Sequence, residues 1–208
     1  CQKMNRRLSM RNMSHFIDSL CVDIRIDARS LDGMNFLHKR QIVNYSTPVY
    51  WLLDSDGRIE HVWAGVCDDE EFCESFLKGL EGKSSYRYLK SRIEQKTYSF
   101  DELIAYLDVL RKADMMEEYN RICSNYFCTL SDEDKVNRSY WPLVSRITYD
   151  MREYDYVVSH FIEYEKNVGR MALQNYFIGV FKQVLEQEME LLRAGEKTNL
   201  DFQMERLK

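Results

Sequence analysis

Six cysteines carry the widest range of possible chemistry in this sequence, because a thiol can act as nucleophile, metal ligand or half of a disulfide. None of them stands in the C-x₂-C spacing of a zinc site, so we expect no bound metal. Two pairs lie six and five residues apart. Neither pair faces one side of a single helix, and structural or incidental thiols are the simpler interpretation. The full set is Cys1, Cys21, Cys67, Cys73, Cys123 and Cys128.

The other polar groups indicate no cofactor. The four histidines are scattered, and no order of Ser, His and Asp or of Cys and His points to a hydrolase. The acidic run from Asp68 to Glu71 could suggest calcium, but acids are also typical of the first turn of a helix, where they meet the positive end of its dipole.

The elements of residues 1–82 alternate between helix and strand. Helical patterns cover residues 3–20 and 30–41, and residues 21–27 read as a half-buried strand. Two β-rich runs, 48–54 and 58–65, flank Asp56-Gly57, which predicts a hairpin. An acid-started helix then runs to Gly82. A β–α–β crossover would make strands 21–27 and 48–54 parallel and give a mixed sheet with flanking helices.

Residues 83–208 show no convincing strand and predict an all-helical region, arranged as a bundle or as an array of paired helices. Ser99 and Glu102 form the pattern of a capping box, and Pro142 is placed to open a helix. The expected helical segments are 86–95, 99–112, 114–128, 131–150, 152–168 and 170–193.

The order of several short motifs resembles the thioredoxin-like family over residues 1–82. The resemblance implies an α/β thioredoxin-like domain that lacks its first strand, followed by the α-helical extension 83–208. It also implies a cis bond between Thr47 and Pro48, whose backbone would bind an extended substrate segment. The motifs are Asp27, Ile42-Val43, Thr47-Pro48, Asp56-Gly57 and Gly65.

The segment Cys1-Gln2-Lys3-Met4 resembles the end of the family's W-C-x-x-C-K-x-M element. This likeness implies that Cys1 is the resolving thiol, with the nucleophilic cysteine upstream of residue 1, and that the protein exchanges thiols and disulfides. Two other origins of Cys1 stay open, an incidental first residue and a lipidated one. The alternative function is a redox-inactive module whose helical half recognises a protein partner.

The composition restricts the classes of molecule that the protein is expected to bind. The net charge is −5, and no strong basic excess favours nucleic acid. No apolar run is long enough to span a bilayer. The helical half resembles the C-terminal region of Bacteroidetes-type thioredoxin-like proteins, which implies export to the periplasm. We therefore expect protein thiols, protein disulfides or a protein partner as the binding target.

Overall fold

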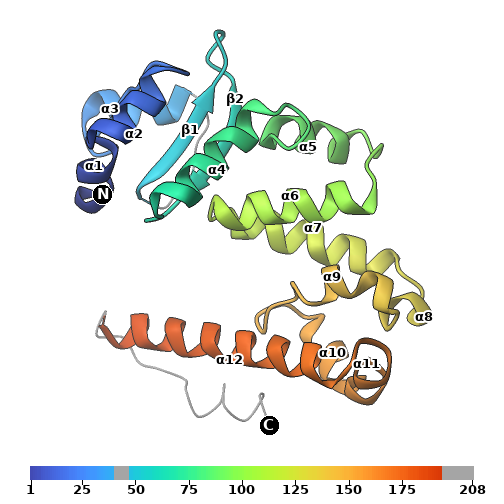
Figure 1. Ribbon diagram of the computed structural model, residues 1–208. Helices are drawn as coiled ribbons and strands as arrows, with labels where there is room; N and C mark the ends of the chain where they lie inside the picture. Colours follow the sequence, from blue (N-terminus) through green and yellow to red (C-terminus); the bar gives the residue numbers. More distant parts are fainter. Residues whose placement is uncertain (40–46, 194–208) are drawn as a thin grey trace. The chain divides into compact units, whose positions relative to one another are not determined.

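The computed structural model describes residues 1–39 and 47–193, which hold twelve α-helices, a 3₁₀ helix and two strands (Figure 1). The chain divides into two units, one ending at Tyr119 and the other beginning at Asn120. The division falls within α7 (Met116–Thr129), so α5 and α6 belong to the first unit.

The first unit is built around a hairpin. Strands β1 and β2 pair antiparallel, with Val49 opposite Ala64 and Tyr50 opposite Trp63. Gly57 in the turn has a φ of 77°, a conformation that glycine adopts without strain, and the predicted hairpin is confirmed. The elements are α1 (Gln2–Leu8), α2 (Arg11–Asp18), α3 (Leu31–Lys39), β1 (Val49–Leu53), β2 (Ile59–Ala64), α4 (Asp69–Leu80), α5 (Tyr86–Glu94) and α6 (Phe100–Lys112).

An aromatic core fixes the first helices to the hairpin. The ring of Trp63 lies 5.3 Å from that of Tyr50 and 5.4 Å from that of Phe72, which comes from α4. Met4 of α1, only 1% exposed, and Ile17 of α2 are buried in the same cluster. Burial of these large apolar side chains is the main force that holds α1, α2 and α4 together with β2.

The predicted fold class of residues 1–82 is wrong. Among the described residues the sheet has two antiparallel strands, and helices dominate, so the structure is not a thioredoxin-like α/β fold with a mixed sheet. The expected strand 21–27 carries no strand structure, and its Val22 and Ile24 side chains are 83% and 73% exposed. The motif residues Ile42 and Val43 lie outside the described residues.

The reason for this difference is that alternation of apolar and charged residues favours an extended chain but supplies no neighbouring strand. Without a neighbour, the backbone of residues 22–27 has no ladder to join. Polar contacts hold the segment instead. Arg25 donates to Asp23 at 2.9 Å and to Ser9, the C-cap of α1, at 3.0 Å.

The second unit is helical, and α12 spans the predicted residues 170–193, whereas the segments predicted at 131–150 and 152–168 break into shorter helices. The segment 131–150 breaks because the Asn137 side chain accepts the Ser139 N–H and starts a new 3₁₀ turn. Pro142 lies in the first turn of α9, as predicted. The elements after α7 are α8 (Asp132–Lys135), η1 (Arg138–Tyr140), α9 (Trp141–Val144), α10 (Tyr154–Ser159), α11 (Phe161–Val168) and α12 (Arg170–Arg193).

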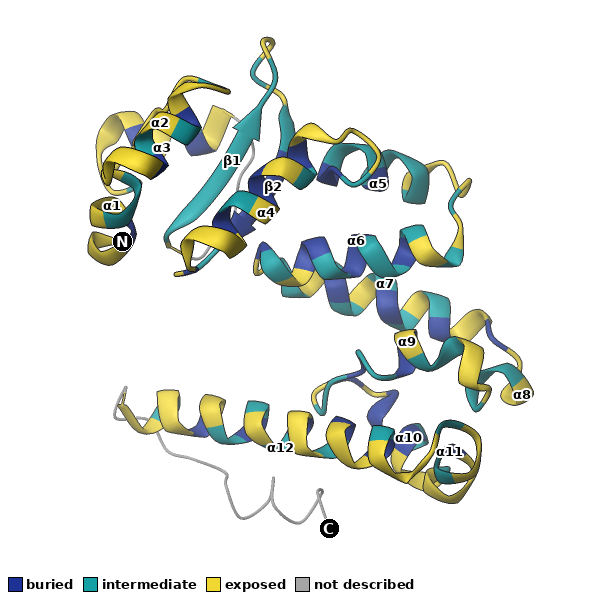
Figure 2. Ribbon diagram, in the orientation of Figure 1, coloured by how far each residue is buried: buried dark blue, intermediate teal, exposed yellow. Residues whose placement is uncertain are grey.

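The long helix α12 has apolar residues on two sides. Leu173, Val180 and Val184 are buried, whereas Met171 and Ile178 are 76% and 53% exposed; both classes are visible along the helix in Figure 2. The buried residues recur at the 3.6-residue period of a helix that packs on one face.

Candidate functional site

The residues predicted to act on a substrate lie in the first unit. Cys1 is a free, exposed thiol at the N-cap of α1. Thr47 is exposed and Pro48 is half-buried. The Thr47–Pro48 peptide bond is cis, as the resemblance implied.

The connection between β2 and α4 forms hydrogen bonds with two other parts of the first unit. One is α1, which follows Cys1, and the other is the segment that begins at Pro48. We call this connection their common anchor. The Gly65 N–H donates to the Pro48 carbonyl at 2.8 Å. Two residues further on, the Cys67 carbonyl accepts a hydrogen bond from the Arg7 guanidinium, which also pairs with Asp69 at 3.0 Å. Cys1 itself forms no side-chain hydrogen bond or ion pair with Thr47 or Pro48 among the described residues.

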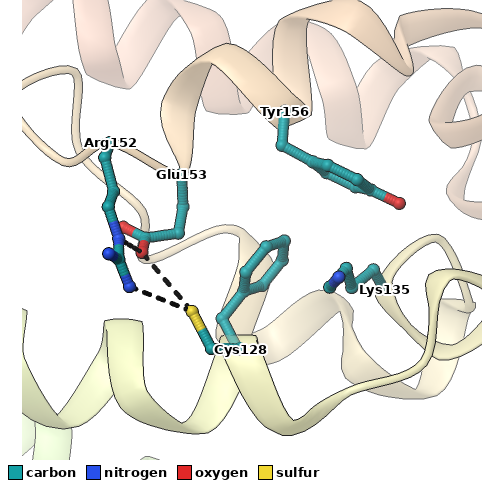
Figure 3. A pocket seen from close by; sticks show the side chains of 6 residues that line it. Cys128, Lys135, Arg152, Glu153 and Tyr156 are labelled. Carbon is teal, nitrogen blue, oxygen red and sulfur yellow. Dashed lines mark hydrogen bonds and ion pairs between the residues drawn. The ribbon is translucent and has the colours of Figure 1, made fainter.

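A second cluster of reactive side chains lines a pocket of about 310 Å³ in the second unit (Figure 3). The end of α7 contributes two of its residues, the end of α8 one, α10 one, and the two positions just before α10 the remaining two. The loop before α10 therefore brings together groups that lie up to twenty-nine positions apart in the sequence (156 against 127). The lining residues are Phe127, Cys128, Lys135, Arg152, Glu153 and Tyr156.

The thiol of Cys128 lies against a charged pair. The Arg152 Nη2–H donates to the Cys128 Sγ at 3.1 Å, and the Arg152 Nε–H donates to the Glu153 carboxylate at 2.7 Å. The other Glu153 oxygen accepts from Ser124 at 2.8 Å. Glu153 is only 4% exposed, so both hydrogen bonds compensate the loss of water around its charge.

The pKa values of this pair follow from these contacts. Burial alone would raise the pKa of Glu153, but the hydrogen bonds from Arg152 and Ser124 outweigh it and the pKa is lowered. The same hydrogen bond from Arg152 to Glu153 raises the pKa of the guanidinium. Both groups are therefore charged at neutral pH, with the positive one at the pocket rim.

A second cation lies across the pocket from the thiol. The Lys135 Nζ is 5.2 Å from the centre of the Tyr156 ring and 5.6 Å from that of Phe127, within the range of a cation–π contact. It also donates to Asp132 at 3.0 Å, and this hydrogen bond raises the pKa of Lys135. The Tyr156 hydroxyl is buried and has no hydrogen-bond partner among the described residues.

Cys123 and Cys128, both interpreted from the sequence as structural or incidental thiols, differ in burial. Cys123 is fully buried, and burial raises the pKa of its thiol to about 12, so it is unreactive at neutral pH. Cys128 is exposed. No spacing in the sequence could have linked it to Arg152, because the chain between them turns through several short helices before it returns.

No protein-family model, no curated protein and no solved structure matches the chain. The resemblance to thioredoxin-like proteins therefore stays a prediction. Among residues 1–39 and 47–193, no three His, Cys, Asp or Glu side chains are placed to hold a metal ion. Within the same residues no helix combines the length and apolarity needed to cross a bilayer.

Proposed function

We propose that this protein exchanges thiols and disulfides with protein substrates and that Cys1 is the thiol that reacts. The observation that carries the proposal is the common anchor described above. The helix that presents the exposed Cys1 and the segment that presents the exposed Thr47 are both attached to the few residues between Gly65 and Asp69. A reactive sulfur and an accessible backbone segment on one anchor suit an extended peptide substrate.

The chemistry requires the thiolate of Cys1, a substrate disulfide and a second thiol. The Cys1 sulfur attacks one sulfur of a substrate disulfide, a new S–S bond forms, and the other substrate sulfur leaves as a thiolate. A second thiol then attacks the mixed disulfide, which releases the substrate and completes the exchange. Both steps are attacks of a thiolate on a disulfide sulfur. As a resolving thiol, Cys1 carries out the second step when another cysteine has formed the mixed disulfide, and the first step when it meets a substrate disulfide directly.

The charges beside Cys1 favour this step. The first turn of α1 contains no acidic residue, and Lys3 and Arg6 follow Cys1 closely. Positive charge near a sulfur stabilises the negative charge that it carries when it attacks or leaves. Met4, buried in the aromatic core, holds this turn in place.

The proposal is tested by following mixed-disulfide formation between the whole chain and a disulfide-containing peptide by intact mass. Cys1→Ser should abolish the adduct at this site, whereas Cys128→Ser, which removes the other exposed thiol, should leave it unchanged. Pro48→Ala should slow reaction with the peptide but not with a small aromatic disulfide, because only the peptide uses the backbone beside Thr47.

Two results would overturn the proposal: a Cys1 that reacts with the peptide no faster than a free thiol in solution, or an adduct that persists at full rate in Cys1→Ser. The first result would favour the alternative, a module without thiol chemistry that binds a protein partner through residues 83–208, and the second would place the exchange on another cysteine.

A further inference from the structure

We propose that Cys128 is a second reactive thiol, which forms a reversible mixed disulfide with a small carboxylate-bearing disulfide held in the pocket of Phe127, Lys135 and Tyr156. This inference is independent of the function proposed for Cys1, because it concerns another cysteine in the other unit of the chain.

The pocket is large enough, and Cys128 is accessible enough, for a small group to be bonded to the sulfur. Its volume of about 310 Å³ lies at the lower end of the range found for small-molecule sites. Cys128 is exposed, and Figure 3 shows its sulfur beside Arg152 with Lys135 and Tyr156 on the other side of the opening. A group bonded to this sulfur can therefore lie in the pocket without displacing the buried core.

The charges of the pocket select an anionic reactant. Arg152 is 74% exposed, so its guanidinium can reach an incoming carboxylate. Lys135 is 17% exposed and points over the rings of Phe127 and Tyr156. One acid, Glu153, accepts hydrogen bonds from Arg152, from Ser124 and, at 3.9 Å, from the Cys128 thiol itself. The other, Asp132, pairs with Lys135 while itself 87% exposed.

The hydroxyl of Tyr156 adds a donor that the protein does not use. Its oxygen is buried, lacks a hydrogen-bond partner among the described residues and belongs to a residue that lines the pocket. A buried hydroxyl without a partner is unfavourable, and a carboxylate or amide oxygen of a ligand that accepted its hydrogen bond would remove this cost. Figure 3 shows this oxygen at the end of the ring that points away from Cys128, so it would contact the far part of a group bonded to the sulfur. Two cations and this donor in one pocket therefore fit a small peptide-like acid.

The reaction step balances with the disulfide as its only co-reactant. The Cys128 thiol loses its proton to solvent, and the sulfur attacks one sulfur of the small disulfide. The S–S bond of the reactant breaks, the Cys128–S bond forms, and the second half leaves as a thiolate. The Nη2–H of Arg152 donates to the attacking sulfur and stabilises the negative charge on it during the exchange. A free thiol of the same class reverses the step.

The test compares two small disulfides of opposite charge on the Cys1→Ser background, so that the first proposal cannot affect the result. Glutathione disulfide carries carboxylates, whereas cystamine carries only ammonium groups. Adducts are located by peptide mass after a fixed time at low salt. We expect Cys128 to react about tenfold faster with glutathione disulfide than with cystamine, and we expect this preference to shrink as salt screens the charges.

Charge-removing variants identify the residues that cause the preference. Arg152→Gln and Lys135→Gln should each reduce it, and Arg152→Lys should restore part of it. Arg170→Gln is the matched control, because Arg170 is 76% exposed, also pairs with a glutamate and lies outside the pocket. The proposal fails if both disulfides react equally, if Arg152→Gln and Arg170→Gln behave alike, or if the glutathione adduct forms mainly on other cysteines.

Discussion

At the scale of single residues, the six cysteines differ in burial, and their positions in the sequence do not indicate this difference. Cys67 and Cys123 are buried, Cys21 and Cys73 are half-buried, and Cys1 and Cys128 are exposed. Burial raises the pKa of the four thiols that are not exposed, and nearby acids such as Asp23 for Cys21 add to the effect. Because the thiolate is the reactive form, burial and a raised pKa both make a thiol less reactive.

We therefore predict that a limiting amount of iodoacetamide at pH 7.5 labels Cys1 and Cys128 first, and that Cys123 is labelled last. Peptide mapping by mass spectrometry measures the order directly. The unfolded chain in urea is the control, in which all six thiols should react at comparable rates. Labelling of Cys123 as fast as Cys128 in the folded protein would contradict the packing described for α7.

At the scale of elements, patterns that are local in sequence were sufficient for prediction and patterns that need a distant partner were not. The hairpin at Asp56-Gly57 and the capping box of Ser99 and Glu102 both form as expected, because each depends on residues within a few positions. The strand expected at 21–27 needed to pair with the strand expected at 48–54, which forms as β1 but pairs with β2 alone among the described residues. The pocket around Cys128 depends on the fold of residues 132–153, where one predicted helix became three short ones.

Two glycines inside helices give a matched prediction about packing. A Cβ on Gly79 of α4 would lie 2.7 Å from the His61 Cβ and 2.8 Å from the Leu52 Cδ2, so the helix can approach the hairpin only because this side chain is absent. A Cβ on Gly179 of α12 would meet nothing within 4 Å. The same substitution should therefore have opposite effects at the two positions.

We expect Gly79→Ala to lower the free energy of unfolding by about 1–3 kcal/mol through overpacking. Gly179→Ala should raise it by up to about 1 kcal/mol, because alanine loses less entropy in a helix. Urea unfolding of both variants and the parent measures the difference. A stabilised Gly79→Ala protein would show that α4 does not pack this closely on the hairpin.

At the scale of the whole molecule, the stability of the chain should depend on pH through a buried histidine where three elements of the first unit meet. His61 of β2 is 3% exposed. Its Nδ1 accepts the Tyr86 N–H at 3.1 Å at the start of α5, and its Cβ faces Gly79 of α4. Because Nδ1 is the acceptor, the neutral ring carries its proton on Nε2, and adding a second proton would break the contact.

Burial, together with the positive charges of Lys78 and Lys112, lowers the pKa of His61 to about 4, against an ordinary value near 6.5. Between these two pH values the unfolded chain binds the proton and the folded chain does not. The free energy of unfolding must therefore be largest above pH 6.5, fall as the pH drops and level off below pH 4. The full difference is about 3 kcal/mol, of which about 2 kcal/mol is lost by pH 5.

Urea unfolding at pH 7.5 and pH 5.0 measures this loss, and His61→Asn provides the comparison. The Asn oxygen can accept the Tyr86 N–H in place of Nδ1 but does not titrate. Carboxylates whose pKa is lowered, such as Asp54 and Glu102, remain in both proteins, so their contribution to acid sensitivity cancels in the difference. We expect the parent to lose about 2 kcal/mol more than His61→Asn between the two pH values. Equal losses would mean that His61 takes up its proton in the folded chain as readily as in the unfolded one, and that the contact with α5 does not exclude the charged ring.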